Sequence, residues 1–315
     1  MGKASRTKQD SDRRARIAAQ REAQRRAEQR KRIYLAGGSV LVVAIVAVAL
    51  VLVKLNSSPG AASNGPTGAA LTKVTNQVTG VPASVTDKVA GGGVKKSLFI
   101  PGSQLSAASQ QGSPYFSTVN GQALTAHGKP EVLYLGAEYC PFCAAQRWAM
   151  VNALSRFGTF TGLTTTHSSS SDTDPNTPTF TFYKSTYTSK YISFTPVEET
   201  GNERDASGNY PTLQTPTADQ QKVAQTYDPS GSIPFFDLGN KYVQVGNLSP
   251  LDPAMLAGKS WSDVSAAMND PTSDIGKAIV GNANYMTAGI CKLTNNQPST
   301  ACTPAIQQLQ GDLAS

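Results

Sequence analysis

Histidine and cysteine are scarce in this chain, and their scarcity limits the chemistry that it can support. The 315 residues include two histidines, His127 and His167, and four cysteines. A structural zinc site needs four ligands, usually cysteines and histidines in closely spaced pairs. The sequence therefore gives little support to a zinc site or to a Cys-His or Ser-His nucleophile. We expect each histidine to lie at the surface or in a loop, and we predict no metal and no cofactor.

Positive charge is also scarce once the first 32 residues are set aside. Residues 1–32 contain twelve Lys and Arg and four acids, a net charge of +8. Since the whole chain carries +7, the other 283 residues sum to about −1. The basic balance therefore belongs to the N-terminal tail alone. This distribution argues against a nucleic-acid partner for the folded part.

Charge is absent from residues 33–53, an apolar run of 21 residues. At about 1.5 Å per residue, a helix of that length spans the roughly 30 Å hydrocarbon core of a bilayer. Twelve basic residues precede it, which predicts a cytoplasmic N-terminus and an extracytoplasmic C-terminal part. A cleaved signal peptide is the alternative, but both the basic region and the apolar run are long for one. We predict a single-pass cell-membrane protein with an uncleaved signal anchor.

Composition divides the chain into four parts. Residues 1–32 form a basic cytoplasmic tail and residues 33–53 the transmembrane helix. Residues 54–96 form a linker and docking segment, beginning with a stretch rich in Ser, Gly, Ala, Pro and Asn. Within this part, residues 71–89 have valines spaced by three or four, which predicts a helix or two turns that dock on the domain. Residues 97–315 form the extracytoplasmic domain.

The domain has the pattern of an α/β fold. Residues 131–137 are apolar on both faces, as in a central strand covered by helices. Aromatic residues between 180 and 194 predict two strands with a turn near 185–190. Residues 199–216 are polar and predict a loop, and two apolar runs joined by Gly239-Asn240 predict a hairpin over 232–245. Helices are predicted over 143–157, 218–227, 261–268 and 274–288.

Two cysteines stand where the central strand gives way to a helix, in the sequence Cys140-Pro141-Phe142-Cys143. Two thiols one helical turn apart can close a small disulfide ring. The first N–H groups of a helix have no intrahelical partner, and the helix dipole is positive there, so a thiolate on Cys140 is favoured. This context favours a redox dithiol over an inert disulfide or half a zinc site.

The chain resembles the thioredoxin-like superfamily in these residues. A strand runs into Cys-x-x-Cys at a helix start, and about ninety residues later Ile233-Pro234 opens a hairpin. Residues 136–149 and 154–158 are most similar to the membrane-anchored branch catalogued as a domain of unknown function (DUF929). The resemblance implies a thioredoxin-like fold with insertions, preceded here by one transmembrane helix. It also implies a cis Ile233-Pro234 bond that faces the dithiol and forms the substrate-binding loop.

Position suggests a role for each residue of the dithiol. Cys140 is expected to have the more exposed of the two sulfurs and to be the attacking thiolate. Cys143, one turn into the helix, is shielded and resolves the mixed disulfide. Phe142 stands where strongly oxidising relatives have a histidine, so we expect a less stabilised thiolate and a less extreme potential. Glu138 is either the acceptor of the resolving proton or a solvated carboxylate at the strand end.

Cys291 and Cys302 form the other cysteine pair, separated by a turn-rich stretch. Outside the membrane four cysteines usually pair, and local pairing needs the least rearrangement. We expect a structural disulfide between Cys291 and Cys302. A second redox pair that passes electrons to the first is the alternative.

Together these features predict a thiol-disulfide oxidoreductase that acts on thiols and disulfides of secreted or membrane proteins. A membrane redox partner would recycle the dithiol. Two alternatives stay open: a non-enzymatic binding module with structural disulfides, and a copper-delivery protein, which would need a histidine placed to bind metal after the dithiol. The sequence does not define the direction of exchange.

Overall fold

The computed structural model describes residues 65–92, 100–101, 116–246 and 251–314. The predicted basic tail, the predicted transmembrane helix, and residues 54–64 and 93–96 of the predicted linker and docking segment lie outside the described residues. None of the helices in the described ranges has both the length and the apolar character needed to cross a bilayer. The chain from Ala62 onward forms one unit, and the description below concerns that unit.

A mixed sheet is the centre of this unit. Its strands are β1 (Ile100–Pro101), β2 (Ser117–Thr118), β11 (Tyr242–Val245), β10 (Phe235–Leu238) and β4 (Lys129–Gly136), in that spatial order. Both β3 (Thr125–Ala126) and β9 (Ser193–Glu198) pair with β4, along its beginning and the rest of its length respectively. Strand β9 runs parallel to β4, whereas β10 runs antiparallel to it.

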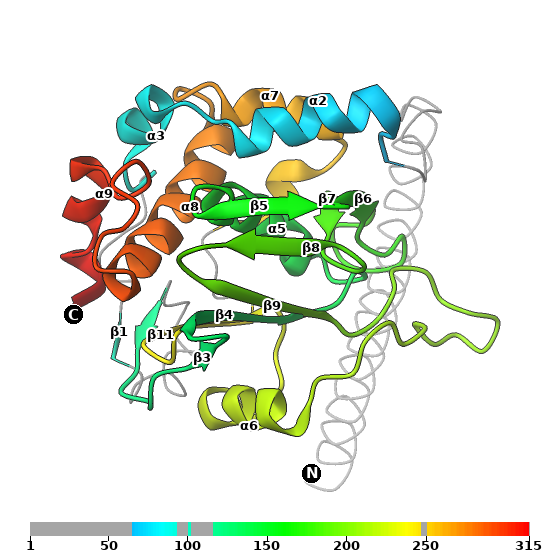
Figure 1. Cartoon of the computed structure of the whole chain (residues 1–315). Helices are drawn as coiled ribbons and strands as arrows, with labels where there is room; N and C mark the ends of the chain where they lie inside the picture. The colour runs from blue at the N-terminus through cyan, green and yellow to red at the C-terminus, as the bar shows by residue number, and fades with distance from the viewer. Residues whose placement is uncertain (1–64, 93–99, 102–115, 247–250, 315) are drawn as a thin grey trace, which may run out of the picture. The chain divides into compact units, whose positions relative to one another are not determined.

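Helices cover both faces of the sheet (Figure 1). On one face lie α5 (Pro141–Ser155) and α8 (Asp274–Leu293), with α7 (Trp261–Met268) and α9 (Pro304–Leu309) packed against α8. On the other face lies α6 (Ala218–Tyr227). Alternate residues of each strand enter the two cores, as the pleat requires: Val132 and Tyr134 face α5, and Leu133 and Leu135 face α6. The prediction of a mixed α/β fold is confirmed.

Several predicted elements match the structure closely. Helices α6 and α7 have the predicted bounds, and α8 continues five residues beyond the predicted end. The hairpin turn falls at Gly239 and Asn240, which have φ of 62° and 60°. Both values lie in the left-handed region that two-residue hairpin turns require.

The aromatic stretch after α5 differs from the prediction. It contains three strands, β7 (Pro178–Thr181), β8 (Thr186–Ser189) and β9, and the turn predicted near 185–190 is occupied by β8. Strand β8 pairs with β5 (Gly158–Thr161), and β7 pairs with β6 (Thr164–His167), each as a separate two-stranded sheet. The prediction was wrong because these strands pair outside the main sheet, so their alternation did not indicate one hairpin.

The predicted docking segment forms two helices, α2 (Gly68–Thr79) and α3 (Ala83–Val89). The break falls at Pro82, which caps α3. Val74, Val78 and Val89 are buried in the main core, and the Asn152 side chain donates a hydrogen bond to the Val78 carbonyl at 2.7 Å. This segment is therefore part of the folded unit.

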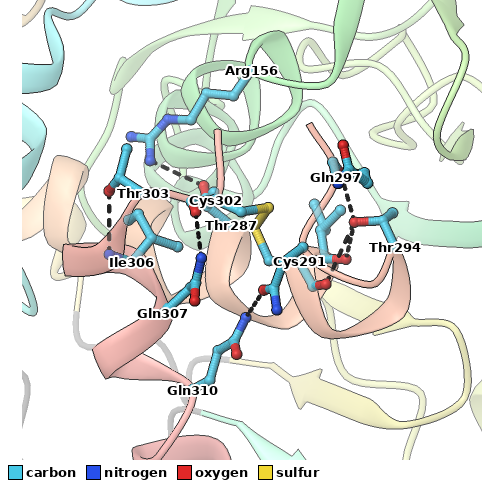
Figure 2. Close-up of a disulfide and its surroundings, with 12 residues drawn as sticks. Arg156, Thr287, Cys291, Thr294, Gln297, Cys302, Thr303, Ile306, Gln307 and Gln310 are labelled. Atoms are coloured by element: carbon cyan, nitrogen blue, oxygen red, sulfur yellow. Dashed lines mark hydrogen bonds between the residues drawn. A yellow bond between two sulfur atoms is a disulfide. The ribbon is translucent and has the colours of Figure 1, made fainter. Parts of the chain in front are cut away.

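A disulfide joins Cys291, near the end of α8, to Cys302, just before α9 (Figure 2). Both cysteines are buried. The Gln307 amide donates to the Cys302 carbonyl, and Thr294 bonds to the carbonyls of Ile290 and Gln297. The disulfide thus closes the turn between α8 and α9, two helices that pack on each other.

Candidate functional site

The candidate site lies at the junction of β4 and α5. Strand β4 ends at Gly136, and α5 begins at Pro141, whose missing N–H suits the first helical turn. Two backbone hydrogen bonds fix the connection between β4 and α5 to neighbouring segments. The Glu138 N–H donates to the Thr200 carbonyl at 2.9 Å, and the Ser169 N–H donates to the Tyr139 carbonyl at 2.8 Å.

Cys140 is the N-cap residue of α5. The backbone N–H of Cys143 donates to the Cys140 sulfur, with a distance of 3.2 Å. Both cysteines are free thiols. Cys140 is 5% exposed and Cys143 is 0% exposed, so the outer sulfur belongs to Cys140, in the order that the sequence predicts. The fold thus places a helix N-terminus at the outer sulfur.

The environment moves the pKa values of the two thiols apart. Hydrogen bonding from Cys143, through its side chain and its backbone, lowers the pKa of Cys140, and Arg147 lowers it further. Burial raises the pKa of Cys143 well above its ordinary value. An outer thiolate and an inner thiol are the pair of protonation states that disulfide exchange requires.

The Ile233-Pro234 loop faces the outer sulfur. Its peptide bond is cis. The Cys140 thiol points at the Ile233 carbonyl, with a sulfur to oxygen distance of 3.9 Å. Pro234 is buried and Ile233 is half-buried. The structure thus brings together the four residues Cys140, Cys143, Ile233 and Pro234, which are separated by about ninety positions in the sequence.

A buried ion pair lies beneath the dithiol, and the sequence analysis did not predict it. Arg147, one turn after Cys143 in α5, donates from Nε and Nη2 to the two carboxylate oxygens of Glu198, at 2.8 and 2.6 Å. Both side chains are fully buried. Nη2 also donates to the Ala137 carbonyl at 2.7 Å, which fixes the connection between β4 and α5.

Arg147 supplies a positive charge that the expectation drawn from Phe142 did not include. No histidine charge stands between the two cysteines, but a guanidinium lies on the inner side of the helix and lowers the pKa of both thiols. The sequence offered one signal: an arginine within a mostly apolar helix, four positions after Cys143. Its partner Glu198, at the end of β9, could be identified only from the fold.

One comparison with known proteins matches a segment that contains most of the residues of this site. Residues 115–228 match the family model described as Domain of unknown function (DUF929). The match confirms the resemblance to DUF929 that the residues around the dithiol predicted. The DUF929 segment includes the dithiol and the Arg147–Glu198 pair, and it ends before the Ile233-Pro234 loop. No curated protein and no solved structure matches the chain.

Glu138 is a buried residue of the DUF929 segment rather than a solvated carboxylate at the strand end. Burial raises its pKa, and a hydrogen bond with Thr181 opposes that rise. Of the nearby charged groups, Arg147 opposes the rise and Glu198 adds to it. It therefore lies in the same polar region as the ion pair.

The two histidines have different environments. His127 is exposed in the turn between β3 and β4, as predicted. His167 ends β6 and is buried, so the prediction of a surface position was wrong for it. Its Nδ1 lies 2.8 Å from the Ser168 carbonyl, and the Asn202 side-chain amide donates to the His167 backbone carbonyl. Within the described ranges, no three His, Cys, Asp and Glu side chains are grouped as a metal site would require.

Tyr134 completes the region under the dithiol. Its ring lies 5.9 Å from the Arg147 guanidinium carbon, and burial raises the pKa of its hydroxyl well above the ordinary value. Among the described side chains, Tyr134 Oη and Arg147 Nη1 are buried without a hydrogen-bond partner. The inner side of the dithiol is therefore polar and charged, although α5 is buried along nearly its whole length.

Proposed function

We propose that this chain is a thiol-disulfide oxidoreductase with a thioredoxin-like fold, held at the membrane by residues 33–53 and acting on extracytoplasmic proteins. The observation that carries the proposal is Cys140, a thiol that caps a helix N-terminus, accepts the Cys143 N–H and faces the Ile233 carbonyl. The helix N-terminus and the Cys143 N–H favour a thiolate at the outer position. The Ile233 carbonyl accepts from the protonated thiol.

The connectivity of the sheet supports the thioredoxin-like fold. The order β11-β10-β4-β9 has β4 and β9 parallel and joined through α5, while β10 and β11 form an antiparallel hairpin. Along the chain this gives a strand, the dithiol helix, a parallel strand, a helix, the proline-led hairpin and a final helix. The superfamily resemblance implies that succession. In this proposed fold the two small sheets β5–β8 and β6–β7 are insertions.

The proposed reaction proceeds in two exchanges. The Cys140 thiolate attacks one sulfur of a substrate disulfide, forming a mixed disulfide and releasing the other sulfur as a thiolate. Cys143 then attacks the Cys140 sulfur, which closes the Cys140–Cys143 disulfide and releases the second substrate thiol. The substrate gains two electrons and the dithiol loses two. The reverse sequence oxidises a substrate dithiol.

The protonation states support the same order of events. Because burial raises the pKa of Cys143, this thiol keeps its proton while Cys140 attacks. In the second exchange Glu138 is the candidate acceptor of the Cys143 proton, and it then returns that proton to the departing substrate sulfur. Arg147 stabilises negative charge on either cysteine through its position beneath both.

The location and partners follow from the N-terminal part of the sequence. Twelve basic residues before an uncharged run of 21 residues support a cytoplasmic N-terminus and an extracytoplasmic domain. The substrates proposed are thiols and disulfides of secreted or membrane proteins, and a membrane redox partner recycles the dithiol. The potential of that partner decides whether exchange runs as oxidation or reduction.

Substitution of each cysteine tests this mechanism. Cys140→Ser should abolish insulin reduction and peptide oxidation, whereas Cys143→Ser should accumulate mixed disulfides with substrates, visible as adducts that dithiothreitol removes. Cys291→Ser with Cys302→Ser serves as the matched control and should retain exchange. Full activity of the Cys140→Ser protein would refute the mechanism.

A further inference from the structure

The segment that follows β9 lies against the dithiol connection. We call residues 199–213 the site loop. Its first residues continue the pairing of β9: the Glu199 N–H donates to the Gly136 carbonyl at 2.7 Å, and Thr200 accepts from Glu138. Its last residues return to the start, because the Leu213 N–H donates to the Glu199 carbonyl at 2.9 Å. In Figure 1 the site loop extends to one side between β9 and α6.

Internal hydrogen bonds give the site loop a defined shape. Thr200 and Thr212 form a bridge, and the Gly201 N–H donates to the Pro211 carbonyl. At the tip the Asp205 carboxylate accepts from the Ser207 and Asn209 N–H groups. The loop predicted from the sequence is therefore a folded excursion with paired arms and a turn.

A stack of three side chains fixes the site loop to the residue before the outer sulfur. The rings of Tyr139 and Tyr210 lie 4.4 Å apart, at an interplanar angle of 6°. The Arg204 guanidinium carbon lies 4.2 Å from the centre of the Tyr210 ring. Since Tyr139 covers one face of that ring, Arg204 covers the other. Arg204 also donates to the Gly208 carbonyl at 2.6 Å.

The stack and the Ile233-Pro234 loop flank Cys140 from opposite sides. Strands β9 and β10 pair with opposite edges of β4, so the site loop lies on the β9 side and Ile233 on the β10 side. Tyr139, Phe142, Tyr210 and Ile233 are each half-buried, so each is partly exposed to solvent. The outer sulfur thus lies between two walls that are partly aromatic and apolar.

We propose that the site loop determines substrate specificity by contacting an extended segment of a protein substrate, with Tyr210 as the positioning residue that holds the loop on Tyr139. This inference rests on the proposed function. A polypeptide continues on both sides of its reacting cysteine, so it must run along the walls beside Cys140. A small disulfide such as oxidised glutathione has little that reaches them. The loop should therefore favour protein substrates over small ones.

The test compares insulin with oxidised glutathione as substrates of the full-length chain. In Tyr210→Ala the ratio of kcat/KM for insulin to kcat/KM for glutathione should fall about 3- to 10-fold, the range expected for a lost aromatic contact. The fall should come through KM for insulin. Tyr210→Phe keeps the ring and should restore the ratio, and Arg204→Ala should give an intermediate loss.

The possible results are distinguishable. An unchanged ratio in Tyr210→Ala, whether both rates fall together or neither changes, would overturn the inference and leave the proposed function standing. A ratio that Tyr210→Phe fails to restore would also overturn it, because stacking would not be the cause. Wild-type protein inactive towards both substrates would refute the proposed function itself, and this inference with it.

Discussion

At the scale of single residues, Arg147 and Glu198 connect the stability of the unit to the chemistry of the dithiol. Both are fully buried and share two hydrogen bonds. Breaking a buried pair by removing one partner costs roughly 3–5 kcal/mol, because the other charge is left uncompensated. We therefore expect Arg147→Met and Glu198→Gln each to lower the free energy of unfolding by about that amount, measured by denaturant titration.

The same two substitutions should move the pKa of Cys140 in opposite directions. Arg147→Met removes the positive charge beneath the sulfur and should raise that pKa, whereas Glu198→Gln leaves the positive charge unopposed and should lower it. The pH dependence of iodoacetamide alkylation measures both changes. Arg156→Met, which removes a half-buried arginine thirteen positions after Cys143, is the matched control and should leave the pKa of Cys140 unchanged. Shifts of the same sign in both variants would show that only folding had been altered.

Asp237 gives the unit a distinct dependence of stability on pH. The carboxylate is buried on the α6 side of β10 and accepts the Asn240 N–H at 2.6 Å. Burial raises its pKa to about 7, and the nearby Glu131 adds to the rise. A carboxyl group whose folded pKa exceeds its unfolded value stabilises the fold when protonated. Its contribution is complete below about pH 4 and is lost as the pH rises to about 7.

Asp237→Asn should remove this dependence. The variant should be more stable than wild type at pH 8, by up to about 4 kcal/mol, and the difference should shrink as the pH falls to 4. Unfolding free energies of both proteins across that range provide the comparison. A constant difference between wild type and variant would contradict the assignment of the titration to Asp237.

At the scale of elements, the Cys291–Cys302 disulfide joins α8 to the segment before α9. In the chain-entropy model, closing a loop of this size stabilises the folded state by about 3 kcal/mol. Replacing both cysteines by alanine should lower the unfolding free energy by about that amount, with the exchange rate of the dithiol unchanged. A loss of exchange with unchanged stability would instead favour the second redox pair.

The elements show what local sequence can and cannot predict. Helix α6 and the β10–β11 hairpin were predicted because their caps and turn residues lie within the elements themselves. Thr217 and Gln220 form a capping box at α6, and Gly239-Asn240 form the hairpin turn. Strand β8 was missed because its partner, β5, lies about thirty positions earlier and outside the main sheet. Pairing of that kind depends on the tertiary fold.

At the scale of the whole molecule, the candidate site combines segments that are far apart in sequence. The dithiol and its helix context were predicted from adjacent residues. The partner of Arg147 and the burial of Glu138 were not, because they depend on where β9 and the insertions pack. Similarly, Tyr210 lies in a polar stretch that predicts only a loop, and its contact with Tyr139 follows from the pairing of β9 with β4.

The account as a whole depends on a dithiol that exchanges electrons reversibly. Redox titration of the full-length chain in glutathione buffers, with the Cys140 and Cys143 thiols counted by alkylation and mass spectrometry, measures this directly. We predict a midpoint near the roughly −200 to −230 mV of glutaredoxin-like pairs, well below the roughly −120 mV of a strong oxidant. A pair that stays oxidised in buffers poised below about −300 mV would be a structural disulfide and would contradict the account.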